Sequence, residues 1–202
     1  MTKIKFCGLT CAADIEAANQ ICPEYIGFVF AQKSRRHITP DNAAELKRQL
    51  KPEIMAVGVF VDQNPEMIIS LIKRGIIDVI QLHGRESEEY IQYLQKTTGR
   101  PIIKAFLVKS SDDIRKAENC HAEHVLLDAG TGTGKTFNWD LLRDIRRRYF
   151  LAGGLRPDTA ATAVQKYRPY AVDVSTGIET DGHKDHEKMA AFAAAVREVN
   201  NR

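Results

Sequence analysis

The chain has 202 residues, of which 44% are hydrophobic and 27% are charged, and its net charge is +3. This near balance of 29 basic and 26 acidic residues argues against a nucleic-acid-binding protein, whose surface is usually strongly basic. No apolar run approaches the roughly 20 residues that cross a bilayer, and MTKIKFCGLT lacks the features of a signal peptide. Four cysteines without an export signal predict reduced thiols, so we expect a cytoplasmic protein with no nucleic-acid or membrane partner.

Short apolar runs alternate with amphipathic stretches along the whole chain. We expect strands at residues 4–7, 25–30, 54–61, 79–82, 101–106, 125–128, 149–152 and 171–174. We expect helices near residues 11–21, 40–50, 65–74, 86–96, 111–119, 139–148, 157–167 and 185–199. A capping residue followed by proline, in Thr39-Pro40 and in Asn64-Pro65, marks the start of two of these helices. The arginines at 143 and 146–148 are interpreted as the solvated end of another.

Strict alternation of strand and helix predicts a parallel sheet. Eight repeats predict a closed (β/α)8 TIM barrel, an α/β fold with one domain over residues 1–202. An open, doubly wound sheet is the alternative, because periodicity alone does not exclude it. In either fold the functional groups gather where the strands end, and there this sequence is rich in polar, titratable and glycine residues. We therefore expect an active site at that face.

Cys7 ends the first expected strand and has two interpretations. A free cysteine is most often a small buried hydrophobe. Against this, period-two alternation places Lys5 on the same side of the strand, and a nearby cation favours the thiolate, which acts as a base or nucleophile. Cys11, Cys22 and Cys120 fall in or beside expected helices, where the buried interpretation is favoured.

Three further polar residues at strand ends also have two interpretations each. Asp128 either caps the following loop or acts as a general acid, if a pocket of low dielectric raises its pKa. His83 is either a structural residue or a substrate contact. Arg36 suits a carboxylate, although surface arginines are common. No metal site is expected, because the spacing His183-x2-His186 lacks further ligands nearby.

Two glycine-containing segments follow the seventh and eighth strands, where barrels often bind phosphate on backbone N–H groups. These are Gly153-Gly154 and Ser175-Thr176-Gly177. Turn glycines with positive φ are the alternative, but the pair after consecutive late strands favours phosphate.

Residues 129–136, AGTGTGKT, match a relaxed P-loop pattern. A working P-loop turns directly into a helix at Gly-Lys-Thr, whereas here the amphipathic run begins only after Asn138. We therefore interpret the segment as a lid that follows Asp128 and excludes water, and not as a nucleotide site.

Together the strand-end motifs resemble the phosphoribosylanthranilate isomerase family of tryptophan biosynthesis. The matching segments, in the family's order, are Lys5–Thr10, Gly27–Phe30, Ser34–Ile38, Val57–Val61, Gln81–Gly84, Leu127-Asp128, Gly132–Trp139, Leu151–Leu155, Val172–Glu179, Gly182 and Lys184-Asp185. Departures include Phe6 for the usual isoleucine and Arg35-Arg36-His37 for a frequent Pro-Arg-Tyr.

The resemblance implies a cofactor-free aldose–ketose isomerase. Such enzymes convert N-(5-phosphoribosyl)anthranilate to 1-(2-carboxyphenylamino)-1-deoxyribulose 5-phosphate. It implies Cys7 as general base and Asp128 as general acid. It further implies that Arg36 or its neighbour Arg35 receives the anthranilate carboxylate, with Asp173 near a sugar hydroxyl and phosphate on the two glycine-containing segments. We expect a monomer or a homodimer with this small-molecule substrate.

Three alternatives remain open at this point. A related sugar-phosphate isomerase would more naturally use aspartates at the first and fifth strands, which end here in Cys7 and in Lys104-Ala105-Phe106. A P-loop NTPase would bind nucleotide. A non-catalytic phosphosugar-binding barrel would leave Cys7 and Asp128 inert.

Overall fold

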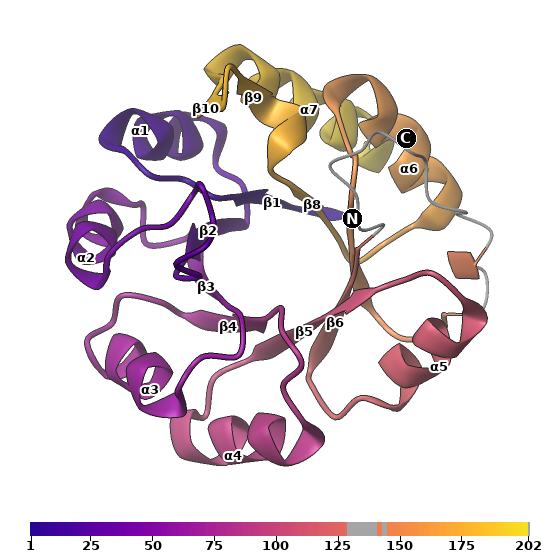
Figure 1. The fold of residues 1–202 in the computed structure, drawn as a ribbon. Helices are drawn as coiled ribbons and strands as arrows, with labels where there is room; N and C mark the ends of the chain where they lie inside the picture. The colour runs from indigo at the N-terminus through magenta and orange to yellow at the C-terminus, as the bar shows by residue number, and fades with distance from the viewer. Residues whose placement is uncertain (129–140, 143–144, 202) are drawn as a thin grey trace.

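The computed structural model describes residues 1–128, 141–142 and 145–201, and its centre is a closed barrel of eight parallel strands (Figure 1). Neighbours in sequence are neighbours in the barrel, and β1 pairs with β8 to close it. The strands are β1 (Lys3–Cys7), β2 (Tyr25–Val29), β3 (Met55–Phe60), β4 (Val79–Leu82), β5 (Ile102–Leu107), β6 (His124–Asp128), β7 (Tyr149–Ala152) and β8 (Ala171–Val174). The predicted (β/α)8 barrel is therefore confirmed, and the open doubly wound sheet is wrong.

An outer ring of helices surrounds the strands (Figure 1). The helices are α1 (Ala12–Ile21), α2 (Pro40–Gln49), α3 (Pro65–Lys73), α4 (Glu88–Thr98), α5 (Ser111–Asn119), α6 (Pro157–Tyr167) and α7 (His186–Asn200). The two expected caps form, since the side chain of Thr39 accepts from the N–H of Asn42 and that of Asn64 from the N–H of Glu66. Within the described part of the chain, no helix is long and apolar enough to cross a membrane.

The helix expected at residues 139–148 does not extend to its predicted C-terminal end. Of residues 139–148, the structure describes 141–142 and 145–148, and residues 145–148 are not helical. Arg147 instead donates to the carbonyls of Ala117, Cys120 and Ala122, and the backbone N–H groups of Arg146 and Arg147 both bind the Glu118 carboxylate. These contacts tie the segment to the end of α5, so Arg146–Arg148 are not the end of a helix, and Arg143 lies outside the described residues. The AGTGTGKT segment lies outside the described residues.

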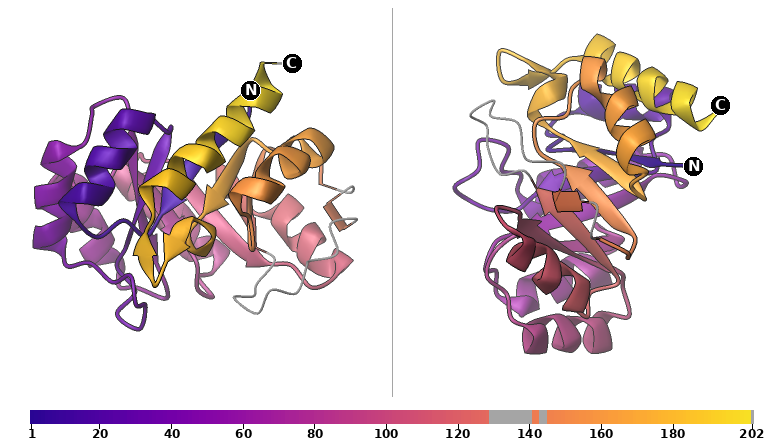
Figure 2. Two further views of the ribbon diagram at one scale, coloured as in Figure 1. Left: turned by 90° about the horizontal axis from the view of Figure 1, so that it is seen from above. Right: turned by 90° about the vertical axis from the view of Figure 1, so that its right-hand side faces the viewer.

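A short 3-10 turn and a hairpin follow β8 and were not expected from the sequence. The turn covers Thr176–Ile178, and the hairpin joins β9 (Glu179–Thr180) to β10 (His183–Lys184) in antiparallel fashion. Both chain termini lie at one end of the barrel, and the hairpin lies at the opposite end (Figure 2). The hairpin therefore stands at the face where the strands end.

Side chains alternate along β1 between the two sides of the barrel wall. Ile4 and Phe6 are buried in the layer between strands and helices, whereas Cys7 packs with Val29 and Val59 in a separate cluster. Lys5 has no exposed surface, and its ammonium lies beside Cys7 on the inner side. The expected shared side of Lys5 and Cys7 is therefore confirmed.

Candidate active site

Cys7 is the last residue of β1 and is buried at the end of the barrel interior. Gly27 on β2 makes room for it, because a Cβ there would lie 2.9 Å from Cys7 Sγ and 3.2 Å from Lys5 Nζ. Burial raises the pKa of the Cys7 thiol, while the ammonium groups of Lys5 and Lys184 oppose that rise. The expected cation is thus present, but burial dominates, so the thiol form is favoured near neutral pH.

Lys5 forms a buried ion pair with Asp173 on β8. Lys5 Nζ lies 2.9 Å from Asp173 Oδ1, and the two residues are register partners of the β1–β8 ladder. Burial alone would lower the pKa of Lys5, but the Asp173 carboxylate and the Cys7 sulfur outweigh it and raise that pKa. We expected Asp173 to lie near a sugar hydroxyl. In this structure its carboxylate contacts the Lys5 ammonium.

Asp128 is the last residue of β6, three strands from β1 around the barrel, and its side chain is 24% exposed. His83, just after β4, brings its Nε2 to 3.4 Å from Asp128 Oδ2, and its Nδ1 lies 3.3 Å from Gln81 Nε2. The structure thus joins two residues that the sequence could only list separately. The Asp128 carboxyl group therefore lies next to the His83 imidazole, which can donate a proton to it or accept one from it.

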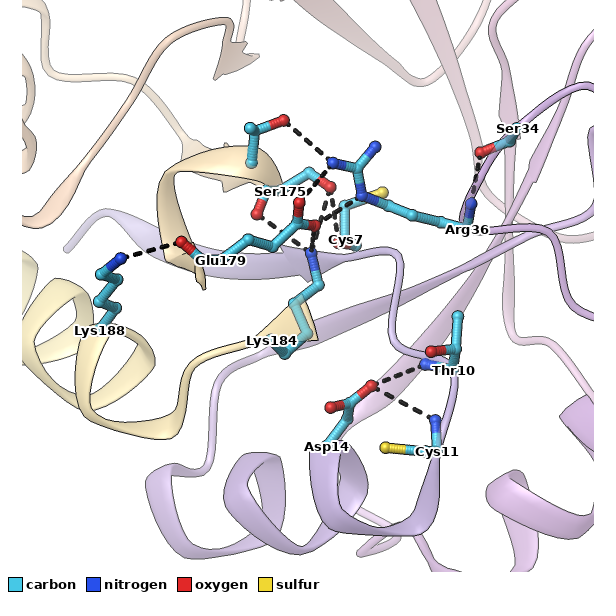
Figure 3. Close-up of polar contacts among 11 residues, drawn as sticks. Cys7, Thr10, Cys11, Asp14, Ser34, Arg36, Ser175, Glu179, Lys184 and Lys188 are labelled. Atoms are coloured by element: carbon cyan, nitrogen blue, oxygen red, sulfur yellow. Dashed lines mark hydrogen bonds and ion pairs between the residues drawn. The ribbon is translucent and has the colours of Figure 1, made fainter. Parts of the chain in front are cut away.

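Arg36 reaches the site from the loop after β2. Its side chain crosses Gly8, directly after Cys7, so closely that a Cβ on Gly8 would lie 2.4 Å from Arg36 Cδ. Gly8 also has a φ of 81°, which disfavours other residues. Arg35 is exposed, whereas Arg36 is half-buried and lies beside Cys7 (Figure 3). Of the two arginines, the structure places Arg36 at the site.

Glu179 and Lys184 join Arg36 in a group that we call the rim cluster (Figure 3). The Glu179 carboxylate accepts from Arg36 Nε and Nη2, each at 2.6 Å, and from Lys184 Nζ at 2.6 Å. The β9–β10 hairpin creates this group, since Glu179 and Lys184 are cross-strand partners. Sequence reasoning gave them no role. The Asp181-Gly182 turn, with φ of 52° and 82°, was the signal that could have found the hairpin.

The two glycine-containing segments come together at the same face. Gly177 touches the loop after β7 so closely that a Cβ would lie 1.9 Å from the carbonyl oxygen of Leu155. Gly153 and Gly154 have φ of 93° and 69°, and a Cβ on Gly154 would meet no atom within 4 Å. The Ser175 hydroxyl donates to the Cys7 carbonyl at 3.0 Å. Ser175 would therefore bind an anion through its backbone N–H and not through its hydroxyl.

The fold and this face define a (β/α)8-barrel enzyme with titratable groups at the carboxyl ends of its strands. Among residues 1–128, 141–142 and 145–201, no group of three His, Cys, Asp or Glu side chains could hold a metal ion. The family model described as N-(5'-phosphoribosyl)anthranilate (PRA) isomerase matches residues 4–195. The chain belongs to this family.

Relatives and solved structures agree with that assignment. N-(5'-phosphoribosyl)anthranilate isomerase of Acetivibrio thermocellus is 40% identical, over 99% of this chain and 98% of that protein. The enzyme of Clostridium acetobutylicum is 42% identical, over 98% of each chain. Phosphoribosyl anthranilate isomerase from Thermotoga maritima superposes with a TM-score of 0.91 at 35% identity, covering 98% of this chain and all of that one.

A further solved isomerase of the same name holds reduced 1-(o-carboxyphenylamino)-1-deoxyribulose 5-phosphate. It superposes with a TM-score of 0.88 at 34% identity, over 98% of this chain and all of that one. The function expected from the resemblance is therefore confirmed: the chain is a phosphoribosylanthranilate isomerase of tryptophan biosynthesis, an intramolecular oxidoreductase. The P-loop NTPase and the non-catalytic barrel are wrong.

Proposed function

We propose that this barrel isomerises N-(5-phosphoribosyl)anthranilate with Cys7 as general base and Asp128 as general acid. The observation that carries the proposal is the position of these two residues. Each is the last residue of its strand, on β1 and β6, so the two side chains belong to one face of the barrel. A substrate bound across that face can meet an acid at one end of the sugar and a base at the other.

Ring opening comes first and needs a proton donor. Asp128 would give its proton to the ribose ring oxygen, which breaks the bond from that oxygen to C1′ and leaves a protonated imine. Asp128 must therefore be protonated when the substrate is bound. The substrate's phosphate and carboxylate favour this form, because nearby negative charge disfavours a second carboxylate.

Proton removal from C2′ follows. The adjacent iminium acidifies this C–H bond, so a thiolate is a sufficient base. The thiolate of Cys7, which is the minor form near neutral pH, would take the proton to give the enolamine. Tautomerisation of the enolamine then gives the aminoketose. Lys5 and Lys184 are the two cations that favour the thiolate form of Cys7 against the effect of burial.

Three anchors would hold the substrate for these transfers. Arg36 would bind the anthranilate carboxylate, and the backbone N–H groups around Gly153, Gly154 and Ser175–Gly177 would bind the phosphate. His83, next to Asp128, and Asp173 would contact the sugar. Fixing the reacting atoms in this way supplies much of the rate enhancement, because proton transfer by a positioned side chain contributes about 10²–10⁴-fold.

We also propose that the enzyme acts in the cytoplasm as a monomer or homodimer, without a cofactor. Four unpaired thiols support the reducing compartment. Both assembly states occur among similar proteins, since one solved structure, at a TM-score of 0.87 and 35% identity, is of monomers generated from the dimeric isomerase of Thermotoga maritima.

The test is loss of substrate fluorescence with purified protein in the presence of a chelator and without added nucleotide or metal. Cys7→Ser and Asp128→Asn should each lower kcat by about 10²–10⁴-fold, because each removes one proton-transfer group. Cys11→Ser and Asp112→Asn are matched controls, since both positions are exposed and outside the site. Near-normal rates in Cys7→Ser and Asp128→Asn would contradict these roles.

A further inference from the structure

The Glu179 carboxylate holds the Arg36 guanidinium by one particular edge. A guanidinium has a side edge, made of Nε and one terminal nitrogen, and an end edge, made of the two terminal nitrogens. Glu179 pairs with the side edge, through Nε and Nη2. On the end edge, Nη2 also donates to the Thr176 hydroxyl at 3.1 Å, whereas Nη1 lies outside the pair with Glu179. A bidentate pair fixes the plane of the guanidinium as well as its position, so Glu179 fixes the direction of the end edge.

Lys184 makes this arrangement possible in a buried setting. Its side chain is 2% exposed and that of Glu179 is 7% exposed, while the side chain of Arg36 is 24% exposed. Burial opposes ionisation of Glu179, but hydrogen bonds from Arg36 and Lys184 outweigh it and hold the pKa of Glu179 below its ordinary value. Glu179 is therefore a carboxylate that accepts from both cations at neutral pH.

The charges of the rim cluster do not cancel. Two cations face one carboxylate, which leaves one positive charge in the group, and its most exposed member is Arg36. A partly buried excess of positive charge is stabilised by an incoming anion. The substrate carries such an anion on its aromatic ring.

The rim cluster is also tied to the two other parts of the site. Lys184 Nζ donates to the carbonyl oxygen of Ser175 at 3.0 Å (Figure 3). Arg36 Nη2 donates to the Thr176 hydroxyl at 3.1 Å. Ser175 in turn bonds the Cys7 carbonyl. Residues of the loop after β8 therefore hold the rim cluster in place beside Cys7.

We propose that Glu179 and Lys184 are positioning residues that select the carboxylate of the substrate. Glu179 turns the end edge of Arg36 toward the substrate, and Lys184 keeps Glu179 ionised and fixed. The inference rests on the proposed role of Arg36 and adds that recognition of the carboxylate depends on a second, internal carboxylate.

The experiment compares two substrates. One is N-(5-phosphoribosyl)anthranilate and the other is N-(5-phosphoribosyl)aniline, which lacks the carboxylate. In Glu179→Gln the value of kcat/KM should fall about tenfold or more for the first substrate, mostly through KM, because a bidentate charged contact is lost. For the aniline compound it should change by less than about threefold. Glu16→Gln, an exposed position on α1, is the control for the change in net charge.

The possible results distinguish a role of Glu179 in orienting Arg36 from a role in balancing charge. Glu179→Gln raises the positive charge of the cluster, so a role limited to charge balance predicts stronger preference for the carboxylate substrate, which would overturn the inference. An equal fall for both substrates would also overturn it, since it indicates general damage to the site. Inactivity of the wild type toward phosphoribosylanthranilate would instead refute the proposed function itself.

Two further variants keep the test open if Glu179→Gln does not fold. Glu179→Asp retains the buried charge but shortens its reach by one methylene, and it should lose part of the same preference. Lys184→Met should also lose the preference, whereas Lys188→Met should not. Lys188 is a matched control because it donates to the backbone carbonyl of Glu179 at 2.9 Å and is 44% exposed. Equal effects of Lys184→Met and Lys188→Met would refute the role of Lys184.

Discussion

Cys7 lies between two groups of buried charges that differ in balance. Toward the barrel interior, Lys5 and Asp173 form a pair of one cation and one anion, 2.9 Å apart. Toward the rim, Arg36, Glu179 and Lys184 form a cluster of two cations and one anion. The side chains of the inner pair are 0% and 10% exposed, whereas Arg36 in the rim cluster is 24% exposed.

The difference in charge balance indicates different roles for the two groups. A balanced pair has satisfied its charges, so its remaining effect is on its neighbour: Lys5 favours the thiolate of Cys7. An unbalanced cluster with a partly exposed member has unused capacity to bind an anion. We therefore infer that the inner pair serves stability and proton transfer, and that the rim cluster serves substrate binding.

The largest expected effect comes from breaking the inner pair. Lys5→Met leaves Asp173 buried without its partner, so the free energy of unfolding should fall by about 3–5 kcal/mol, as measured by urea unfolding. Arg48→Met, which removes an exposed ion pair with Glu45 on α2, is the control and should cost less than about 1 kcal/mol.

A double variant tests whether the loss of stability in Lys5→Met comes from breaking the ion pair. Lys5→Met with Asp173→Asn removes both charges, so most of the stability lost in Lys5→Met should return. A double variant that loses the sum of the two single losses would indicate that the residues act independently. The inner group would then not be a balanced unit.

A smaller effect is expected on the ionisation of Cys7. Because burial raises the pKa of this thiol, its thiolate should form only above the range of an ordinary cysteine, about 8.5. The thiolate absorbance at 240 nm, taken as wild type minus Cys7→Ser, should therefore rise only in alkaline solution. Lys184→Met should move the rise to still higher pH, since it removes a cation that favours the thiolate.

A Cys7 signal complete at neutral pH would show that the cations dominate burial, which contradicts the protonated state expected of the thiol. An unchanged midpoint in Lys184→Met would mean that the rim cluster does not reach Cys7 electrostatically. The rim cluster would then act on the substrate alone.

Much of the fold could be predicted because its signals are local. The strands 79–82, 149–152 and 171–174 match their expected bounds, since each is a short run of mostly apolar residues. Thr39 and Asn64 cap the helices that their sequence predicts. The end of the expected helix at 145–148 failed because the backbone N–H groups of Arg146 and Arg147 bind the Glu118 carboxylate, 28 and 29 positions earlier, instead of helical carbonyls.

The site could be predicted only as separate strand-end residues. The partnership of Arg36 with Glu179 joins positions 143 residues apart, and no local pattern contains it. The bond from the Ser175 hydroxyl to the Cys7 carbonyl, 168 residues away, is equally invisible in the sequence. Sequence placed Cys7 and Lys5 on one side because alternation is local, but the dominance of burial over the cation depends on the whole barrel.

The most direct test of the division between inner pair and rim cluster is a crystal structure of this protein with reduced 1-(o-carboxyphenylamino)-1-deoxyribulose 5-phosphate. We expect the aromatic carboxylate on the end edge of Arg36, with Glu179 still on the side edge. The phosphate should lie against the backbone of Gly154 and Thr176-Gly177, and the sugar should lie between Cys7 and Asp128. A carboxylate bound away from Arg36, or a Glu179 side chain displaced from it by the ligand, would contradict that division.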